Sequence, residues 1–173
     1  MAEITKKWIA ENMRELMKYK SIDKIRVTEI CKAADIKRPP FYYHFKDKYD
    51  LVALMFYTEA YGTDIISIAS AAAGMNKMKQ NILFYKRAYE DTSQNALWHY
   101  MLEYFVRRYT ELVKEKLDTD NLDTQLVYSI RFYCMGSIGM TQEWVLNDNI
   151  TSAETVVQMM FNSMPEDLRA ILF

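Results

Sequence analysis

The chain contains very few residues that interrupt a helix. Its 173 residues include 4 Gly and 3 Pro, which leaves little material for the turns that many short strands would need. Met, Ala, Leu, Lys and Glu are plentiful, and these residues favour helix over strand. The sequence therefore predicts an all-α fold, with enough chain for one sizeable core or for a small module joined to a larger one.

The first 50 residues predict a cluster of short helices. Apolar residues recur at helical spacing within residues 5–20, at Ile9, Met13, Leu16 and Met17. Ile22 and Ile25 follow as expected core residues, and Val27–Ala34 continues as a second, short helix. The tight turn "DIK" separates that helix from a third one. Two short helices joined in this way, behind a first helix, form a homeodomain-like, three-helix helix-turn-helix unit.

The segment "IKRPPFYYHFKDKYDL" supplies the third helix. Pro39 and Pro40 mark its start, because proline costs little where the first N–H groups have no helical partner. Lys37 and Arg38 add full charges to the positive end of the helix dipole. Such a tip can enter the DNA major groove, with further donors to flanking phosphates. These donors are Tyr42, Tyr43, His44, Lys46 and Lys48.

The same segment allows plainer interpretations. Phe41 and Phe45 lie four residues apart and are expected in the core. Tyr42 or Tyr43 could cover the seam between the first and fourth helices, and His44 could be a structural histidine. Lys46 and Lys48 could be ordinary surface lysines that keep a helix start in contact with water. The interpretation as a DNA contact depends on the clustering of these residues at one end of one helix.

The charges and cysteines restrict the function further. Residues 1–50 hold 12 Lys and Arg against 8 Asp and Glu, whereas residues 51–173 hold 10 against 15, so only the N-terminal part favours a polyanion. Cys31 and Cys134 stand in apolar surroundings and are expected as buried thiols, without a disulfide or a zinc site. His99 is a lone histidine, so no metal is expected, and no cofactor motif or catalytic motif is found. Without a signal peptide or a membrane span, the chain is expected to be soluble and cytoplasmic.

The remainder predicts further helices. Asp47 is expected to cap a fourth helix that continues to about Ile66. "GMN" at 74–76 predicts a break before a helix over about 77–90. Longer helices are predicted over 96–116 and 124–146, and Ser152 is expected to cap a helix that ends near Phe161. Pro165 opens a last short turn.

The stretch "ICKAADIKRPPFYYHFKDKYDL" closely resembles the helix-turn-helix of TetR-family transcriptional regulators over about residues 5–55. "GSIGMTQEWV" and "MPEDL" are similar to a Gram-positive type grouped with dihydroxyacetone-kinase regulators. The resemblance implies a DNA-binding head over residues 1–47 and a helical effector-binding and dimerisation body over residues 48–173. It makes Lys37 and Arg38 candidates for base edges. Tyr42, His44 and Lys48 become candidates for phosphate contacts, and Thr28 would face the DNA backbone.

Three positions depart from the family pattern. Pro40 stands where Thr or Ser is common, so its contact would be apolar, for instance with a thymine methyl group. Asp35 replaces the usual Gly in the turn, and Asp tolerates the left-handed conformation better than most residues. Arg26 stands where a Thr or Ser cap is common, so either Thr28 caps the second helix or Arg26 contacts phosphate instead.

The body offers a candidate effector pocket and a candidate dimer interface. The aromatic and Met-rich helices suggest a pocket, although a packed core between helices is the better explanation for any single one of these residues. The pocket candidates are Tyr61, Trp98, Met101, Tyr104, Phe105, Phe132, Met135 and Trp144. Two glycines in one helical turn suggest close approach by another helix of the same subunit or of its symmetry mate. By resemblance to the family's four-helix dimer interface, the interface candidates are Gly136, Gly139, Met140, Val156, Met159 and Met160.

The sequence thus predicts a homodimeric DNA-binding regulator that binds a near-palindromic operator, with half-sites about one helical turn or slightly more apart. By resemblance it is a repressor relieved by a small-molecule effector. The alternative is a DNA-binding regulator without such an effector, whose body dimerises or binds a protein partner. An enzyme is not expected.

Overall fold

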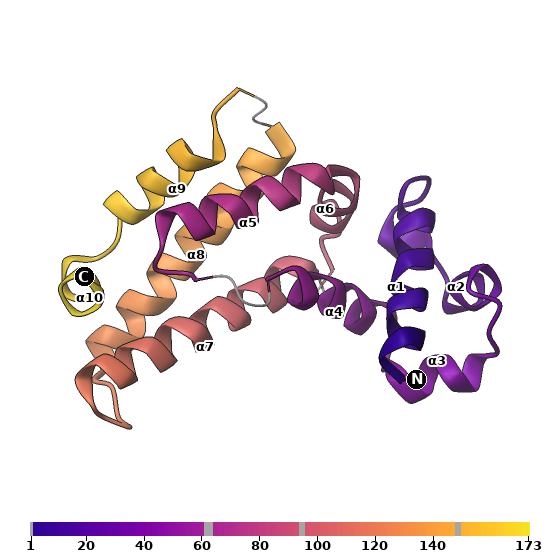
Figure 1. Ribbon diagram of the computed structural model, residues 1–173, viewed down its shortest axis with the longest axis horizontal. Helices are drawn as coiled ribbons and strands as arrows, with labels where there is room; N and C mark the ends of the chain where they lie inside the picture. Colours follow the sequence, from indigo (N-terminus) through magenta and orange to yellow (C-terminus); the bar gives the residue numbers. More distant parts are fainter. Residues whose placement is uncertain (1, 61–63, 94–95, 148–149) are drawn as a thin grey trace. The chain divides into compact units, whose positions relative to one another are not determined.

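A computed structural model describes residues 2–60, 64–93, 96–147 and 150–173, and in these ranges the chain forms helices without a β-strand (Figure 1). The predicted all-α fold is confirmed. The elements are α1 (Ala2–Met17), the 3-10 turn η1 (Ile22–Lys24), α2 (Val27–Ala33), α3 (Arg38–His44), α4 (Lys48–Ala60), α5 (Ile68–Gln80), α6 (Ile82–Tyr89), α7 (Leu97–Leu117), α8 (Thr124–Asn147), α9 (Ala153–Asn162) and α10 (Glu166–Leu172).

The chain divides into two compact units. The first unit comprises Met1–Tyr61 and Asn81–Leu97, and the second comprises Gly62–Gln80 and Trp98–Phe173. Helices α4 and α6 therefore pack with the helix-turn-helix, while α5 belongs to the other unit. The functional boundary after residue 47 stays a prediction.

The core of the first unit follows the predicted apolar pattern. Ile9, Met13 and Met17 of α1 are fully buried. Ile22, the first residue of η1, and Ile25, directly after it, are each 1% exposed, as their sequence positions predicted. Burial of side chains of this size stabilises a fold by about 1.5–3 kcal/mol each. Helix α1 contributes three of them and contacts α2, α4 and α6, so it is the central helix of the first unit.

A polar cluster joins α1, α4 and the start of α6. Glu59 Oε1 accepts hydrogen bonds from Arg14 Nη2 at 2.8 Å and from Asn81 Nδ2 at 3.2 Å, and Glu59 Oε2 accepts one from the Tyr85 hydroxyl at 2.6 Å. The Arg14 guanidinium also lies 5.1 Å from the centre of the Phe84 ring. Burial and the neighbouring carboxylate raise the pKa of Tyr85, which therefore stays a phenol and a donor.

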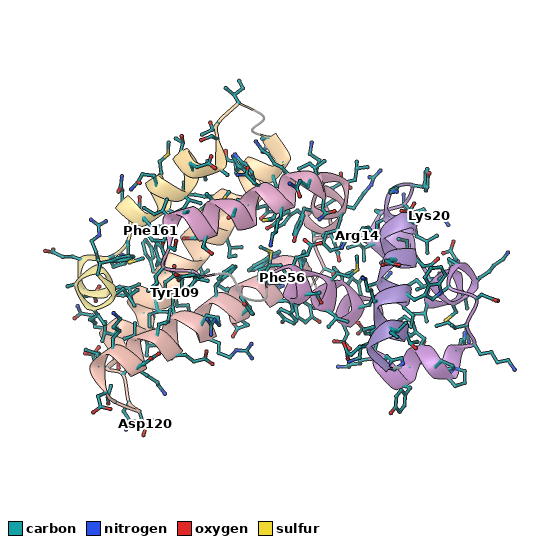
Figure 2. The ribbon with its side chains drawn as sticks, viewed as in Figure 1. Arg14, Lys20, Phe56, Tyr109, Asp120 and Phe161 are labelled. Carbon is teal, nitrogen blue, oxygen red and sulfur yellow. The ribbon has the colours of Figure 1, made fainter. Side chains whose placement is uncertain are left out.

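The second unit is organised around α7 and α8. Tyr109 of α7, labelled in Figure 2, meets Tyr133 of α8 edge to face, with the ring centres 5.4 Å apart. The Tyr109 hydroxyl donates to the Ile65 carbonyl oxygen at 2.9 Å, which fixes the segment before α5 against α7. Helix α5 packs along α9 and also contacts α8, and α10 contacts the other end of α8 (Figure 1).

Two predicted helix limits are wrong. Residues 64–67 form a turn, not the end of the fourth helix, since α4 ends at Ala60 and the Ile65 carbonyl oxygen accepts a hydrogen bond from the Tyr109 hydroxyl. The predicted break at 74–76 is also absent, since α5 continues to Gln80 and the interruption falls at Asn81. Gly in a helix costs only about 1 kcal/mol, which the packing of α5 against α9 offsets.

The predicted cap of α9 and the predicted burial of both cysteines are confirmed. Ser152 Oγ accepts a hydrogen bond from the Thr155 N–H and caps α9, as expected. Cys31 and Cys134 are buried free thiols, and burial raises the pKa of both. Within the described ranges no group of His, Cys, Asp and Glu side chains could hold a metal ion. None of the helices in these ranges combines the length and apolar character that crossing a bilayer requires.

Candidate nucleic-acid interface

Helix α3 begins at the two prolines, as predicted. Lys37 is its N-cap residue, in an extended conformation, and its side chain makes no capping hydrogen bond. Arg38, Pro39 and Pro40 form the first turn, and all of them are exposed together with Lys37. The tip of α3 therefore presents two cations at the positive end of the helix dipole, where Pro39 and Pro40 contribute no backbone N–H.

The two faces of α3 separate core residues from candidate contacts. Phe41 is fully buried and Phe45 is 3% exposed, which confirms that both belong to the core. Tyr42 and Tyr43 are 54% and 83% exposed, so neither covers a seam between helices in this structure. His44 is half-buried, and its ring lies edge to face with Tyr43 at 4.9 Å.

The turn between α2 and α3 adopts the predicted left-handed conformation. Asp35 has φ 51°, a region that Asp enters more easily than most residues. The Ile36 N–H donates to the Cys31 carbonyl oxygen at 2.9 Å and closes the turn. Trp8 of α1 donates through Nε1 to the Ala34 carbonyl oxygen at 2.9 Å. No sequence pattern indicates this last contact, because its partners are 26 positions apart.

The start of α2 is held by a carboxylate. Arg26 is the N-cap residue, and its backbone N–H donates to Glu29 Oε2 at 3.0 Å. Glu29 also pairs with Lys20, and the hydrogen bond from Lys20 holds the pKa of Glu29 below its usual value. Thr28 does not cap α2, so that alternative is wrong; both Arg26 and Thr28 are exposed.

The segment between α3 and α4 places its two lysines differently. The Lys46 side chain is exposed, whereas Lys48 is half-buried. Asp47 Oδ1 accepts hydrogen bonds from the N–H groups of Tyr49 at 2.8 Å and Asp50 at 2.9 Å, which confirms its predicted capping role. The Lys48 ammonium turns back toward η1 and bonds to three backbone carbonyls there.

Two of the candidate pocket residues line a groove in the second unit. Trp98 and Met135 line a half-open groove of about 190 Å³, with Leu102, Ile138, Gly139 and Gln142. Trp144 is 2% exposed and donates through Nε1 to the Thr151 carbonyl oxygen at 2.9 Å, away from that groove.

The other pocket candidates vary in exposure. Met101 is buried, Tyr104 and Phe105 are half-buried, and Phe132 is 74% exposed. Tyr61 lies outside the described residues. Their common role in a pocket stays a prediction.

The candidate interface residues divide between an open face and the protein interior. Gly136, Gly139 and Met140 of α8 and Met159 of α9 are exposed. Val156 and Met160 are only 6% and 7% exposed, because this side of α9 is packed within its own unit, where α9 contacts α5 and α8. A Cβ atom added at either glycine would meet nothing within 4 Å. Close packing inside the subunit therefore does not explain these glycines.

A helix-turn-helix with an exposed, cationic third helix defines the class of DNA-binding proteins that read duplex DNA with a helix. Residues 11–55 match the family described as bacterial regulatory proteins, tetR family. Residues 72–166 match the family described as transcriptional regulator C-terminal region, of the TetR type. The chain belongs to the TetR family of transcriptional regulators.

A solved structure, the dihydroxyacetone kinase operon activator DhaS, has the same fold. The two chains are 19% identical, the likeness covers 96% of this chain and 97% of that chain, and the TM-score is 0.65. At this identity the comparison establishes the fold alone. No curated protein matches the chain.

Proposed function

We propose that this TetR-family regulator is a homodimeric repressor whose two heads bind a near-palindromic operator and release it when a small molecule binds the body. The observation that carries the DNA contact is the two-sided character of α3. Its first turn is exposed and cationic, while Phe41 behind it is fully buried. Such a helix is anchored by its inner side and free to enter a groove with its outer side.

Each candidate contact residue of the head, apart from Lys48, has a proposed partner on the duplex. Arg38 and Lys37 read base edges, since Arg can bind guanine O6 and N7 together, worth about 1–3 kcal/mol of discrimination. Pro39 and Pro40 make apolar contacts, with a thymine methyl group as the partner of Pro40. The proposed phosphate contacts are Arg26, Thr28, Tyr42, Tyr43, His44 and Lys46. Lys48 is left out, because its three N–H groups are bound to carbonyls.

The proposed homodimer uses an apolar stripe on α8. The stripe comprises Tyr128, Phe132, Met135, Gly136, Gly139 and Met140, all exposed in the protomer. Tyr128 and Phe132 are 71% and 74% exposed, which is unusual for aromatic side chains on one face of one helix. A second copy of the same stripe would cover these side chains, and the two glycines would let the helices approach closely.

The charges beside the stripe favour an antiparallel crossing. Arg131 is exposed toward the start of the stripe, where its guanidinium already pairs with Glu103 of the same protomer at 3.1 Å, and Glu143 is exposed beyond the end of the stripe. A two-fold axis near Gly136 would bring Arg131 of one copy toward Glu143 of the other, whereas a parallel arrangement would place like charges together. Opposite charges at the edge of the proposed interface would select the orientation of the two helices more than they would strengthen the dimer.

The test of the DNA contact is protection of the promoter that neighbours the coding region, by the full-length protein at two salt concentrations. Arg38→Ala should reduce the preference for the protected site over unrelated DNA by roughly tenfold or more, while Lys46→Met should weaken binding to both alike. If both variants bound as the unaltered protein does, the assignment of α3 as the contact helix would be wrong.

A second candidate function is a DNA-binding regulator without a small-molecule effector. The packing of Trp144 favours it, because this predicted pocket residue is buried, bonded to Thr151, and covered by the Lys79 ammonium 4.1 Å from its ring centre. The groove at Trp98 is also smaller than the 300–1,000 Å³ typical of ligand pockets. Release of operator DNA by the protein-free, small-molecule fraction of a cell extract would support the effector; release only by a protein fraction would support the second candidate.

The direction of regulation follows from one reporter measurement. The solved structure of similar fold is called an operon activator, so the proposed repressor role needs its own test. A reporter fused to the protected promoter should be expressed more strongly when this chain is removed. Weaker expression would make the chain an activator.

A further inference from the structure

Lys48 is held by backbone carbonyls of the turn that precedes α2. Its Nζ donates to the carbonyl oxygens of Ile22 at 2.6 Å, Asp23 at 2.9 Å and Ile25 at 2.9 Å. An ammonium group has three N–H donors and no acceptor. The three carbonyls therefore use its full donor capacity, and none is left for a phosphate oxygen.

The position of Lys48 in the helix makes this arrangement informative. Lys48 is the first residue of α4, where the helix dipole disfavours a cation. The side chain is half-buried, and removal from water lowers the pKa of Lys48. The carboxylates of Asp23, Asp91 and Asp47 act in the opposite direction on this pKa. A lysine that only solvated the helix start would stay in water.

The bonds made by Lys48 connect two parts of the head that are distant in sequence. The carbonyls belong to η1 and to Ile25, directly before Arg26 and α2, while Lys48 itself follows α3 by a few residues. At the other end of α2, Trp8 holds the Ala34 carbonyl oxygen at 2.9 Å. Helix α2 is thus fixed at both ends by side chains from α1 and α4, and α3 is attached to it through the short turn at Asp35.

We propose that Lys48 is a positioning residue, which sets the orientation of α2 and α3 by holding η1 against the start of α4, and which does not bind DNA phosphate. This inference rests on the proposed DNA-binding function. A phosphate contact would require the ammonium to leave some or all of these three carbonyls, and it would lose hydrogen bonds that a charged donor makes stronger than a neutral one does.

Two substitutions separate positioning from phosphate binding. Lys48→Met keeps the length of the side chain and removes its donors, and Lys46→Met is the matched control on an exposed lysine two positions earlier. Melting temperatures are measured first. Affinities for the promoter duplex and for an unrelated duplex of equal length are then measured over a range of salt, well below the melting temperature.

The two variants should differ in every readout. Lys48→Met should lower the melting temperature and weaken binding to the promoter duplex about tenfold, with the salt slope and the affinity for unrelated DNA unchanged. Lys46→Met should leave the melting temperature unchanged and reduce the salt slope by about one phosphate contact. A Lys48→Met protein with an unaltered melting temperature and a salt slope reduced by about one would overturn the inference.

A third variant retains the charge. Lys48→Arg can still reach a phosphate, but its planar fork does not reproduce a compact ammonium among three carbonyls. It should therefore lose promoter affinity as Lys48→Met does, and full retention of affinity would contradict positioning. If the unaltered protein protected no promoter, the proposed function would fail, while the melting comparison would still show whether the ammonium stabilises the head.

Discussion

Replacing Gly136 by Ala should have opposite effects on the protomer and on the proposed dimer. In the protomer the added Cβ meets nothing within 4 Å, and the same holds at Gly139. Both glycines lie inside α8, where Ala is favoured over Gly by about 1 kcal/mol. Each single change should therefore stabilise the protomer by about 1 kcal/mol, and the double variant by about 2 kcal/mol. Between two closely packed α8 helices the same methyl group would instead cost about 1–3 kcal/mol.

The two effects are measured at different protein concentrations. Urea unfolding of a dilute sample, in which the copies are separate, measures the stability of the protomer. Sedimentation velocity over a range of protein concentrations measures self-association. The expected result is a higher unfolding midpoint at dilution together with weaker association. Unchanged association in both variants would place the dimer contact away from these glycines. A lower midpoint at dilution would refute the reasoning about open space around α8.

Two further substitutions test the interior of the first unit. Glu59→Gln removes the charge that pairs with Arg14 at 2.8 Å, and the Glu59 and Arg14 side chains are only 18% and 30% exposed. Urea unfolding should therefore show a free energy of unfolding lower by about 2 kcal/mol. A change below about 0.5 kcal/mol would mean that solvent screens the pair. Asp47→Ala removes the acceptor that caps α4 and should cost about 1 kcal/mol in the same assay, whereas an unchanged midpoint would show that Asp50 or water replaces the cap.

The elements that the sequence predicted well are those with a local physical cause. Proline fixes its own φ, so Pro39 and Pro40 located the start of α3. Asp47 and Ser152 accept hydrogen bonds from N–H groups within three residues, so their caps could be identified without knowing the rest of the fold. Phe41 and Phe45 lie one helical turn apart on the inner side of the same segment, and their burial followed from that spacing.

The features that the sequence could not predict depend on partners far away in the chain. Glu59 is bonded to residues 45, 22 and 26 positions away, and no spacing rule connects them. Asn81 ends α5 without a Gly or Pro beside it. Phe132 and Trp144 looked alike as aromatic residues on one helix, but only the packing of neighbouring elements exposes one and buries the other. A hydrophobic pattern identifies an apolar face and does not say whether that face is covered by the same chain or by another.

The first unit is assembled from two separate stretches of chain, since α6 returns to it after α5 has been built into the second unit. A fragment that stops after α4 would keep the whole helix-turn-helix but would lack Asn81 and Tyr85, and its Glu59 would lose two of its three donors. The unit that contains the helix-turn-helix is therefore not one continuous N-terminal segment. Exchanging it with that of another regulator would require cutting the chain in two places.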